Sequence, residues 1–132
     1  MRFMTRTLLA LVFAASAASL AAAPQAPAPS ENVKTMAGIL ATLNHFPNDA
    51  EKKTLQGIVE SEAATAHEKT LAEALINLEH TVTAAHKTRL EALSKDQAAP
   101  EPVRTMATIL ASLNHTASAP QKAQLSQIAA AS

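Results

Sequence analysis

Apolar residues recur along the chain at helical spacing, in three segments separated by a constant step. In the first segment they fall at i, i+3, i+4, i+7 and i+10, which places them on one face of a helix. The corresponding sets are Val33, Met36, Ala37, Leu40 and Leu43, then Leu71, Ala72, Leu75 and Leu78, then Val103, Met106, Ala107, Leu110 and Leu113. The pattern therefore predicts three amphipathic helices.

A shorter apolar pair follows each of these stripes and predicts a second helix in every segment. The pairs have i, i+3 spacing; they are Leu55 and Ile58, Leu90 and Leu93, and Leu125 and Ile128. Residues suited to cap a helix N-terminus keep the same step, because their side chains can accept a backbone N–H. They are Asn48, Thr83 and Ser118 for the second helices and Ser30 and Thr65 for two of the first helices.

The whole segment repeats at a step of 35 residues, best seen where Lys34–His45 returns as Lys69–His80 and Arg104–His115. Residues 31–45 and 101–115 agree at 11 of 15 positions. A fixed step of this size indicates tandem supersecondary units. We delimit the repeats as 31–65, 66–100 and 101–132, within a helical repeat domain of residues 31–132.

The fold class expected from this pattern is all-α, with three tandem helical hairpins and six helices. One 35-residue hairpin is too small to be stable alone, so each must bury apolar surface on its neighbour. We expect the hairpins to stack as a short α-solenoid or to form a compact α-α bundle, with the Ala-rich last helix as an outer cap. Only two glycines and no β-branched alternation argue against strands.

The period and the helix-turn-helix form resemble helical-hairpin repeats, the class that includes tetratricopeptide and pentatricopeptide repeats. The resemblance covers residues 31 to about 130 at the level of period and helix pattern only. The aromatic positions of the tetratricopeptide pattern are not met, because Lys34 or Met36 would stand there. No functional residue follows from this resemblance.

The N-terminus predicts export. Arg2 and Arg6 precede an apolar run, and small residues then offer cleavage after Ala21, or as late as Ala23. We interpret residues 1–21 as a signal peptide and 22–30 as a Pro/Ala-rich spacer, which predicts a periplasmic or secreted protein with no membrane contact after cleavage. The alternative is an uncleaved anchor, but the run is shorter than the about 20 residues that a spanning helix needs.

Composition narrows the function classes. The chain has no cysteine, which excludes disulfides and thiol chemistry. The mature chain would carry 9 basic and 11 acidic residues, which does not suit nucleic-acid binding. Phosphate loops and nucleophile motifs are absent from the sequence, so we expect no enzyme activity and no cofactor.

The five histidines are the remaining candidates for chemistry. His45, His80 and His115 close the three first helices, where a histidine can cap the last carbonyl groups. As metal ligands they are weak candidates, because equivalent residues of stacked hairpins would lie about 8–10 Å apart, too far to share an ion. His67 and His86 lie outside the repeat pattern and are expected to face solvent.

Two functions remain open from the sequence. The first is a non-catalytic module of the cell envelope that binds or scaffolds a protein or peptide, or self-associates; Phe46 and Ile76 are its possible contact patch. The alternative is a histidine-dependent protein that binds a metal ion or a small cofactor, suggested by the histidines at 35-residue steps.

Overall fold

The computed structural model describes residues 28–131, and the predicted signal peptide and most of the spacer lie outside this range. The described residues form six α-helices and no strand. The helices are α1 (Glu31–Thr42), α2 (Asp49–Glu60), α3 (Ala66–Ile76), α4 (Ala84–Lys95), α5 (Glu101–Ala111) and α6 (Ala119–Ala130). The expectation of an all-α fold with six helices is therefore confirmed.

Helix starts follow the capping signals. Asn48, Thr65 and Ser118 each accept the N–H of the third helical residue, whose side chain in turn accepts the cap's own N–H, so all three form capping boxes. Ser30 and Thr83 cap α1 and α4 through their hydroxyl groups. The start of α5 lacks a side-chain cap and has a proline in its first turn instead. Corresponding helices begin 35 residues apart in all three repeats.

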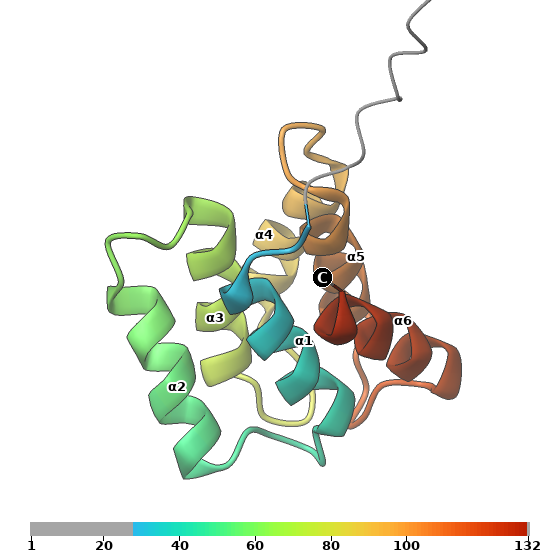
Figure 1. Ribbon diagram of the computed structural model, residues 1–132. Helices are drawn as coiled ribbons and strands as arrows, with labels where there is room; N and C mark the ends of the chain where they lie inside the picture. The colour runs from blue at the N-terminus through green and yellow to red at the C-terminus, as the bar shows by residue number, and fades with distance from the viewer. Residues whose placement is uncertain (1–27, 132) are drawn as a thin grey trace, which may run out of the picture.

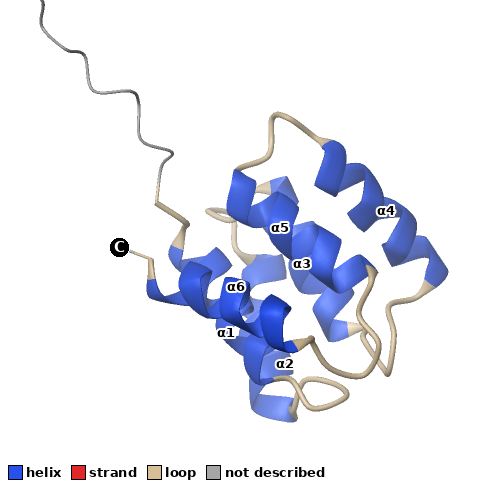
Figure 2. Cartoon of the chain, turned by 90° about the vertical axis from the view of Figure 1, so that its right-hand side faces the viewer, coloured by secondary structure: helices blue, strands red, loops and turns tan. Residues whose placement is uncertain are grey.

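The helices pair in a closed cycle (Figure 1). The most extensive pairing is between α1 and α6, followed by α4 with α5 and α2 with α3. The second helix of each repeat thus packs mainly on the first helix of the next repeat, and α6 packs back on α1. Helices of the same repeat contact each other much less. Figure 2 shows the C-terminal end of α6 beside the start of α1.

This pairing corrects the open stack and the outer capping helix that were expected from the sequence. A linear stack leaves its first and last helices unpaired with each other, whereas here they form the largest contact. The physical reason is that three repeats can bury both apolar faces of every repeat when they close into a cycle. The compact bundle is the alternative that agrees with the helix contacts.

The first helices α1, α3 and α5 contact one another at the centre of the cycle. Their stripes supply most of the core, and the second helices add a smaller share. Fully buried large side chains include Met36, Leu40, Leu71, Leu75, Met106 and Leu110 from the first helices, and Leu55, Leu90 and Leu125 from the second. Each helix within residues 28–131 falls short of the length and apolar character that a bilayer crossing requires.

Candidate functional site

Three histidine rings meet at one end of the molecule. The loops that follow α1, α3 and α5 lie together at the lower end of Figure 1. Each loop carries one histidine of the repeat, and these are His45, His80 and His115. Their ring centroids lie 4.9 to 5.5 Å apart, and all three side chains are exposed. Helix packing at the centre therefore converts a 35-residue sequence step into a spatial cluster.

The Nδ1 atoms of these rings face one another. The Nδ1 of His115 lies 3.1 Å from the Nδ1 of His80 and 3.4 Å from that of His45. One ring nitrogen from each histidine lies within 4.8 Å of the other two. These are the only three His, Asp or Glu side chains within residues 28–131 that gather in a potential metal-binding group.

This convergence constrains the protonation of the rings. A neutral imidazole has one nitrogen that donates and one that accepts, so the Nδ1 of His115 can accept from both neighbours only if each of them carries a proton there. Three lone pairs directed at one point would repel one another. The cluster therefore needs shared protons, or a cation that accepts all three lone pairs, to be favourable.

The backbone around each ring is anchored on both sides. A buried apolar residue stands two positions before every histidine and another stands two positions after it. These residues are Leu43 and Pro47, Leu78 and Val82, and Leu113 and Ala117. The backbone N–H of His115 also donates to the carbonyl oxygen of His80 at 2.8 Å. The exposed rings thus sit on loops whose neighbouring residues are fixed in the core.

Two of the three histidines adopt an unfavourable backbone conformation. His45 has φ 76° and His115 has φ 65°, and they are the two non-glycine residues with positive φ among residues 28–131. The left-handed region costs an L-residue about 1–2 kcal/mol, although His enters it more readily than most residues. Strain of this kind concentrates at functional sites, where the surrounding structure enforces it.

The expectation that these histidines lie too far apart to share an ion is wrong. It assumed a linear stack, in which the side chains of successive repeats point in parallel directions. In the closed cycle the three loops surround a common point, and the side chains bridge the distance between the helix axes. The rings also lie beyond the helix ends, at Thr42, Ile76 and Ala111, and their Nδ1 atoms face one another rather than the last helical carbonyl groups.

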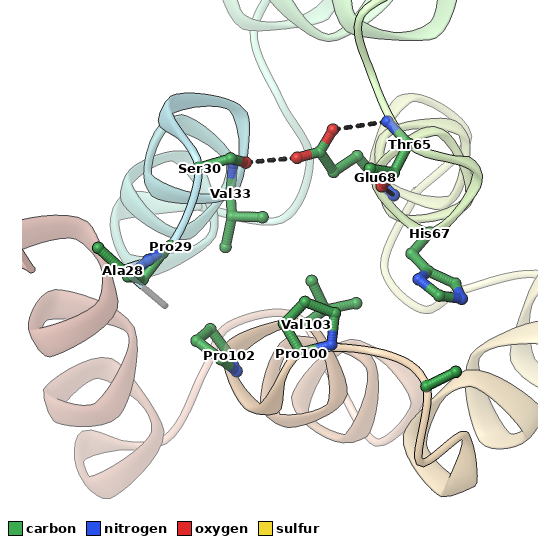
Figure 3. Close-up of a pocket in the computed structure, with 11 residues that line it drawn as sticks. Ala28, Pro29, Ser30, Val33, Thr65, His67, Glu68, Pro100, Pro102 and Val103 are labelled. Atoms are coloured by element: carbon green, nitrogen blue, oxygen red, sulfur yellow. Dashed lines mark hydrogen bonds between the residues drawn. The ribbon is translucent and has the colours of Figure 1, made fainter. Parts of the chain in front are cut away.

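A pocket of about 380 Å³ lies at the opposite end of α1, α3 and α5, where their N-termini meet (Figure 3). Its wall is mostly apolar, with Val33, Val103 and Pro102 among its residues. The polar residues of the wall are Ser30, Thr65, His67 and Glu68. Glu68 is 5% exposed and is the one buried charged residue among residues 28–131. Figure 3 shows its carboxylate between Ser30 and Thr65.

Hydrogen bonds keep this buried carboxylate ionised. Burial raises the pKa of Glu68, but several donors together outweigh that effect and hold the pKa below its ordinary value of 4.5. The hydroxyl of Ser30 donates to Oε1, while the backbone N–H of Thr65 at 2.8 Å and the amide of Asn32 at 3.4 Å donate to Oε2. Because Ser30 and Asn32 belong to the start of α1 and Glu68 to α3, the carboxylate links the first two repeats.

The burial of Glu68 was not predicted from the sequence. The signal was present in the repeat itself, because Glu68 occupies the position of Val33 and Val103 in the apolar stripe. A charged residue at a core position predicts either a buried hydrogen-bonded group or an exposed edge. Which of the two applies depends on the donors of another repeat, and these are not adjacent in sequence.

The other residues singled out from the sequence are not members of the histidine cluster. Phe46 is 53% exposed and its ring lies 5.7 Å from the Lys52 ammonium, whereas Ile76 is partly buried against the core. The two histidines expected to face solvent are instead partly buried. His67 Nε2 lies 3.2 Å from a carboxylate oxygen of Asp96, and His86 Nδ1 lies 2.7 Å from the hydroxyl of the N-cap Thr83.

No protein-family model matches the chain, and neither a curated protein nor a solved structure matches it. The geometry of the three histidines is therefore the main indication of function.

Proposed function

We propose that the protein binds one divalent transition-metal ion through His45, His80 and His115, the metal-dependent alternative that the sequence left open. The observation that carries this proposal is the convergence of one nitrogen from each ring within 4.8 Å. A tetrahedral zinc ion with Zn–N bonds of about 2.0–2.1 Å separates its nitrogen ligands by roughly 3.3–3.4 Å. The two Nδ1 separations of 3.1 and 3.4 Å are close to that value.

The donor set selects the class of ion. Imidazole nitrogen suits Zn²⁺, Cu²⁺, Ni²⁺ and related ions, whereas Mg²⁺ and Ca²⁺ prefer oxygen ligands. Within residues 28–131 the cluster contains imidazole donors alone. We therefore infer a preference for the late first-row ions, with zinc or copper as the best candidates.

Backbone strain supports a role for the cluster beyond loop packing. A loop selected only for its packing would place glycine or asparagine in the left-handed region, where both are less strained than most residues. This chain places His45 and His115 there, with rings that are exposed and bury little apolar surface. The geometry of the rings therefore carries a conformational cost that metal binding would offset.

Protein or peptide binding, the function favoured from the sequence, remains a prediction with less support. Phe46 is the one large apolar side chain exposed among residues 28–131, and Ile76 does not join it as an exposed residue. Stable interfaces bury about 800 Å² per partner around a cluster of anchors, which a single phenylalanine does not provide. The closed helix pairing also leaves no unpaired first or last helix for a partner.

Calorimetric titration of the mature protein, without a histidine tag, tests the proposal directly. Zn²⁺, Cu²⁺, Ni²⁺ and Co²⁺ are titrated separately into chelator-treated protein. We expect one ion per chain for at least one of these metals. His80→Ala should weaken binding at least 100-fold, because loss of even an indirect partner of a metal ligand costs 10–100-fold.

His86→Ala is the matched control. It removes the same side chain from a position outside the cluster, so it should keep the affinity of the wild type. Absence of binding in the wild type would refute the proposal, and so would equal binding by His80→Ala. Retention of binding in His80→Ala but loss in His86→Ala would assign the ion to a different site.

Thermal unfolding gives an independent measurement of metal binding. At a free metal concentration 100 times Kd, a ligand of the folded state adds about 2.7 kcal/mol to the free energy of unfolding. For a domain of about 100 residues this corresponds to a rise in Tm of roughly 11–22 °C. A variant that binds 100-fold more weakly gains only about 0.4 kcal/mol at that concentration.

We further propose that the protein acts outside the cytoplasm, where the predicted signal peptide of residues 1–21 would deliver it. Mass spectrometry of the protein from periplasm and medium tests this point. A mature N-terminus at residue 22 or 24 is expected, and an intact chain that stays with the membrane would contradict it.

A further inference from the structure

We infer that the metal ion held by the three histidines keeps one coordination position open to solvent and binds a small anion there. The inference rests on the proposed function and adds the class of ligand that the bound ion would take. It is drawn from the number of donors, their exposure and their charge.

The number of donors leaves a position to fill. Zinc and cobalt take four or more ligands, and sites that bind exogenous ligands use three protein donors with the remaining position occupied by water or substrate. No fourth His, Asp or Glu joins the cluster in the part of the chain that the structure describes, and the full sequence has no cysteine.

The position of the rings determines where the open site points. His45, His80 and His115 are exposed, so an ion between them is within reach of solvent. On the inner side the chain is anchored by Leu43, Leu78 and Leu113, which are 2–3% exposed and offer no donor atom. The fourth ligand must therefore approach from outside.

The residues beside the three histidines in the chain are exposed to solvent as well. The immediate neighbours of the three histidines along the chain are all exposed, and they are Asn44 and Phe46, Glu79 and Thr81, and Asn114 and Thr116. Within residues 28–131, the hydrogen bonds of the three rings run between Nδ1 atoms, and none joins a ring Nε2 to another protein group.

Charge determines the class of ligand. Three neutral imidazole ligands contribute no negative charge to offset the double positive charge of the ion, and a bound cation is the largest local charge in such a site. A small anion reduces this charge and fits a position bounded by three rings. Azide is a suitable probe, because it is small, monovalent and a single-atom donor.

Visible spectroscopy of the Co²⁺-loaded mature protein tests the inference. Addition of azide should change the Co²⁺ absorption bands in a saturable manner, with one azide per metal. His86→Ala should reproduce this response, whereas His80→Ala should show neither the protein-bound Co²⁺ bands nor the azide effect.

The outcomes separate the two proposals. Co²⁺ bands that azide leaves unchanged would refute the open position while metal binding stands. Dimerisation on addition of Co²⁺, measured by light scattering and unaffected by azide, would assign the fourth ligand to a second copy and also overturn the inference. Absence of protein-bound Co²⁺ bands in the wild type, together with absence of calorimetric binding, would refute both.

Discussion

Substitution by glycine can measure the backbone strain at the histidine cluster, because the three repeats supply their own control. His115 has φ 65°, whereas the φ of His80 lies outside the left-handed region. Both rings are exposed and both belong to the same cluster. The variants His115→Gly and His80→Gly therefore remove the same side chain from two different backbone conformations.

The magnitudes follow from the two conformations. In both variants glycine increases the entropy of the unfolded chain, which lowers stability by about 0.5–1 kcal/mol. In His115→Gly it also relieves the left-handed conformation, which is worth about 1–2 kcal/mol. We expect His80→Gly to be destabilising and His115→Gly to be neutral or stabilising, with a difference of about 1–2 kcal/mol in their free energies of unfolding.

Urea unfolding of chelator-treated protein, followed by circular dichroism, measures this difference. Both variants should unfold with the m-value of the wild type, so that the midpoints report stability alone. His45→Gly, at φ 76°, should behave like His115→Gly. The backbone hydrogen bond from the N–H of His115 to the carbonyl of His80 survives in all three variants.

Equal effects of His115→Gly and His80→Gly would refute the strain argument. A more stable His115→Gly variant that has lost metal binding would support it, because stability would then have been exchanged for function. The loss of metal binding in this variant is measured by the calorimetric titration described above.

Three further predictions concern the fold. Glu68→Gln should lower the free energy of unfolding by about 1–3 kcal/mol at neutral pH. Because the pKa of Glu68 is lowered on folding, its contribution to the free energy of unfolding is present above pH 4.5 and is lost as the pH falls through the folded-state pKa. The variant should therefore lose less stability than the wild type on acidification. Parallel profiles of urea stability against pH would contradict this. A circular permutant can join Ser132 to Ala28 and open the chain between the exposed residues Glu62 and Ala63. It should fold cooperatively, because the new link between α6 and α1 has the same length as the five-residue link 61–65 between α2 and α3. A non-cooperative thermal transition would argue against the closed helix cycle. Leu75→Ala, at a fully buried position, should cost about 2–5 kcal/mol, whereas Phe46→Ala, at an exposed one, should change stability by less than about 0.5 kcal/mol in the same assay.

The sequence determined the local structure of the chain. Helix number and helix starts depend on contacts within a few residues, such as the Thr65–Glu68 capping box, and on an apolar period that a single helix displays by itself. These features could be predicted because their physical causes lie close together along the chain. The repeat step of 35 residues also predicted that equivalent positions share an environment, as Leu40, Leu75 and Leu110 do in the core.

The tertiary structure alone decided how the repeats face one another. An apolar stripe shows that a helix has a buried face but not which helix covers it, so an open stack and a closed cycle have the same sequence pattern. Closure through α1 and α6 brings three loops around one point, and only then do His45, His80 and His115 become a cluster. Glu68 likewise keeps its charge because donors at the start of α1 reach it from another repeat. Both sites depend on contacts between residues far apart in sequence. The distances and orientations of these contacts exist only once the helix cycle has closed.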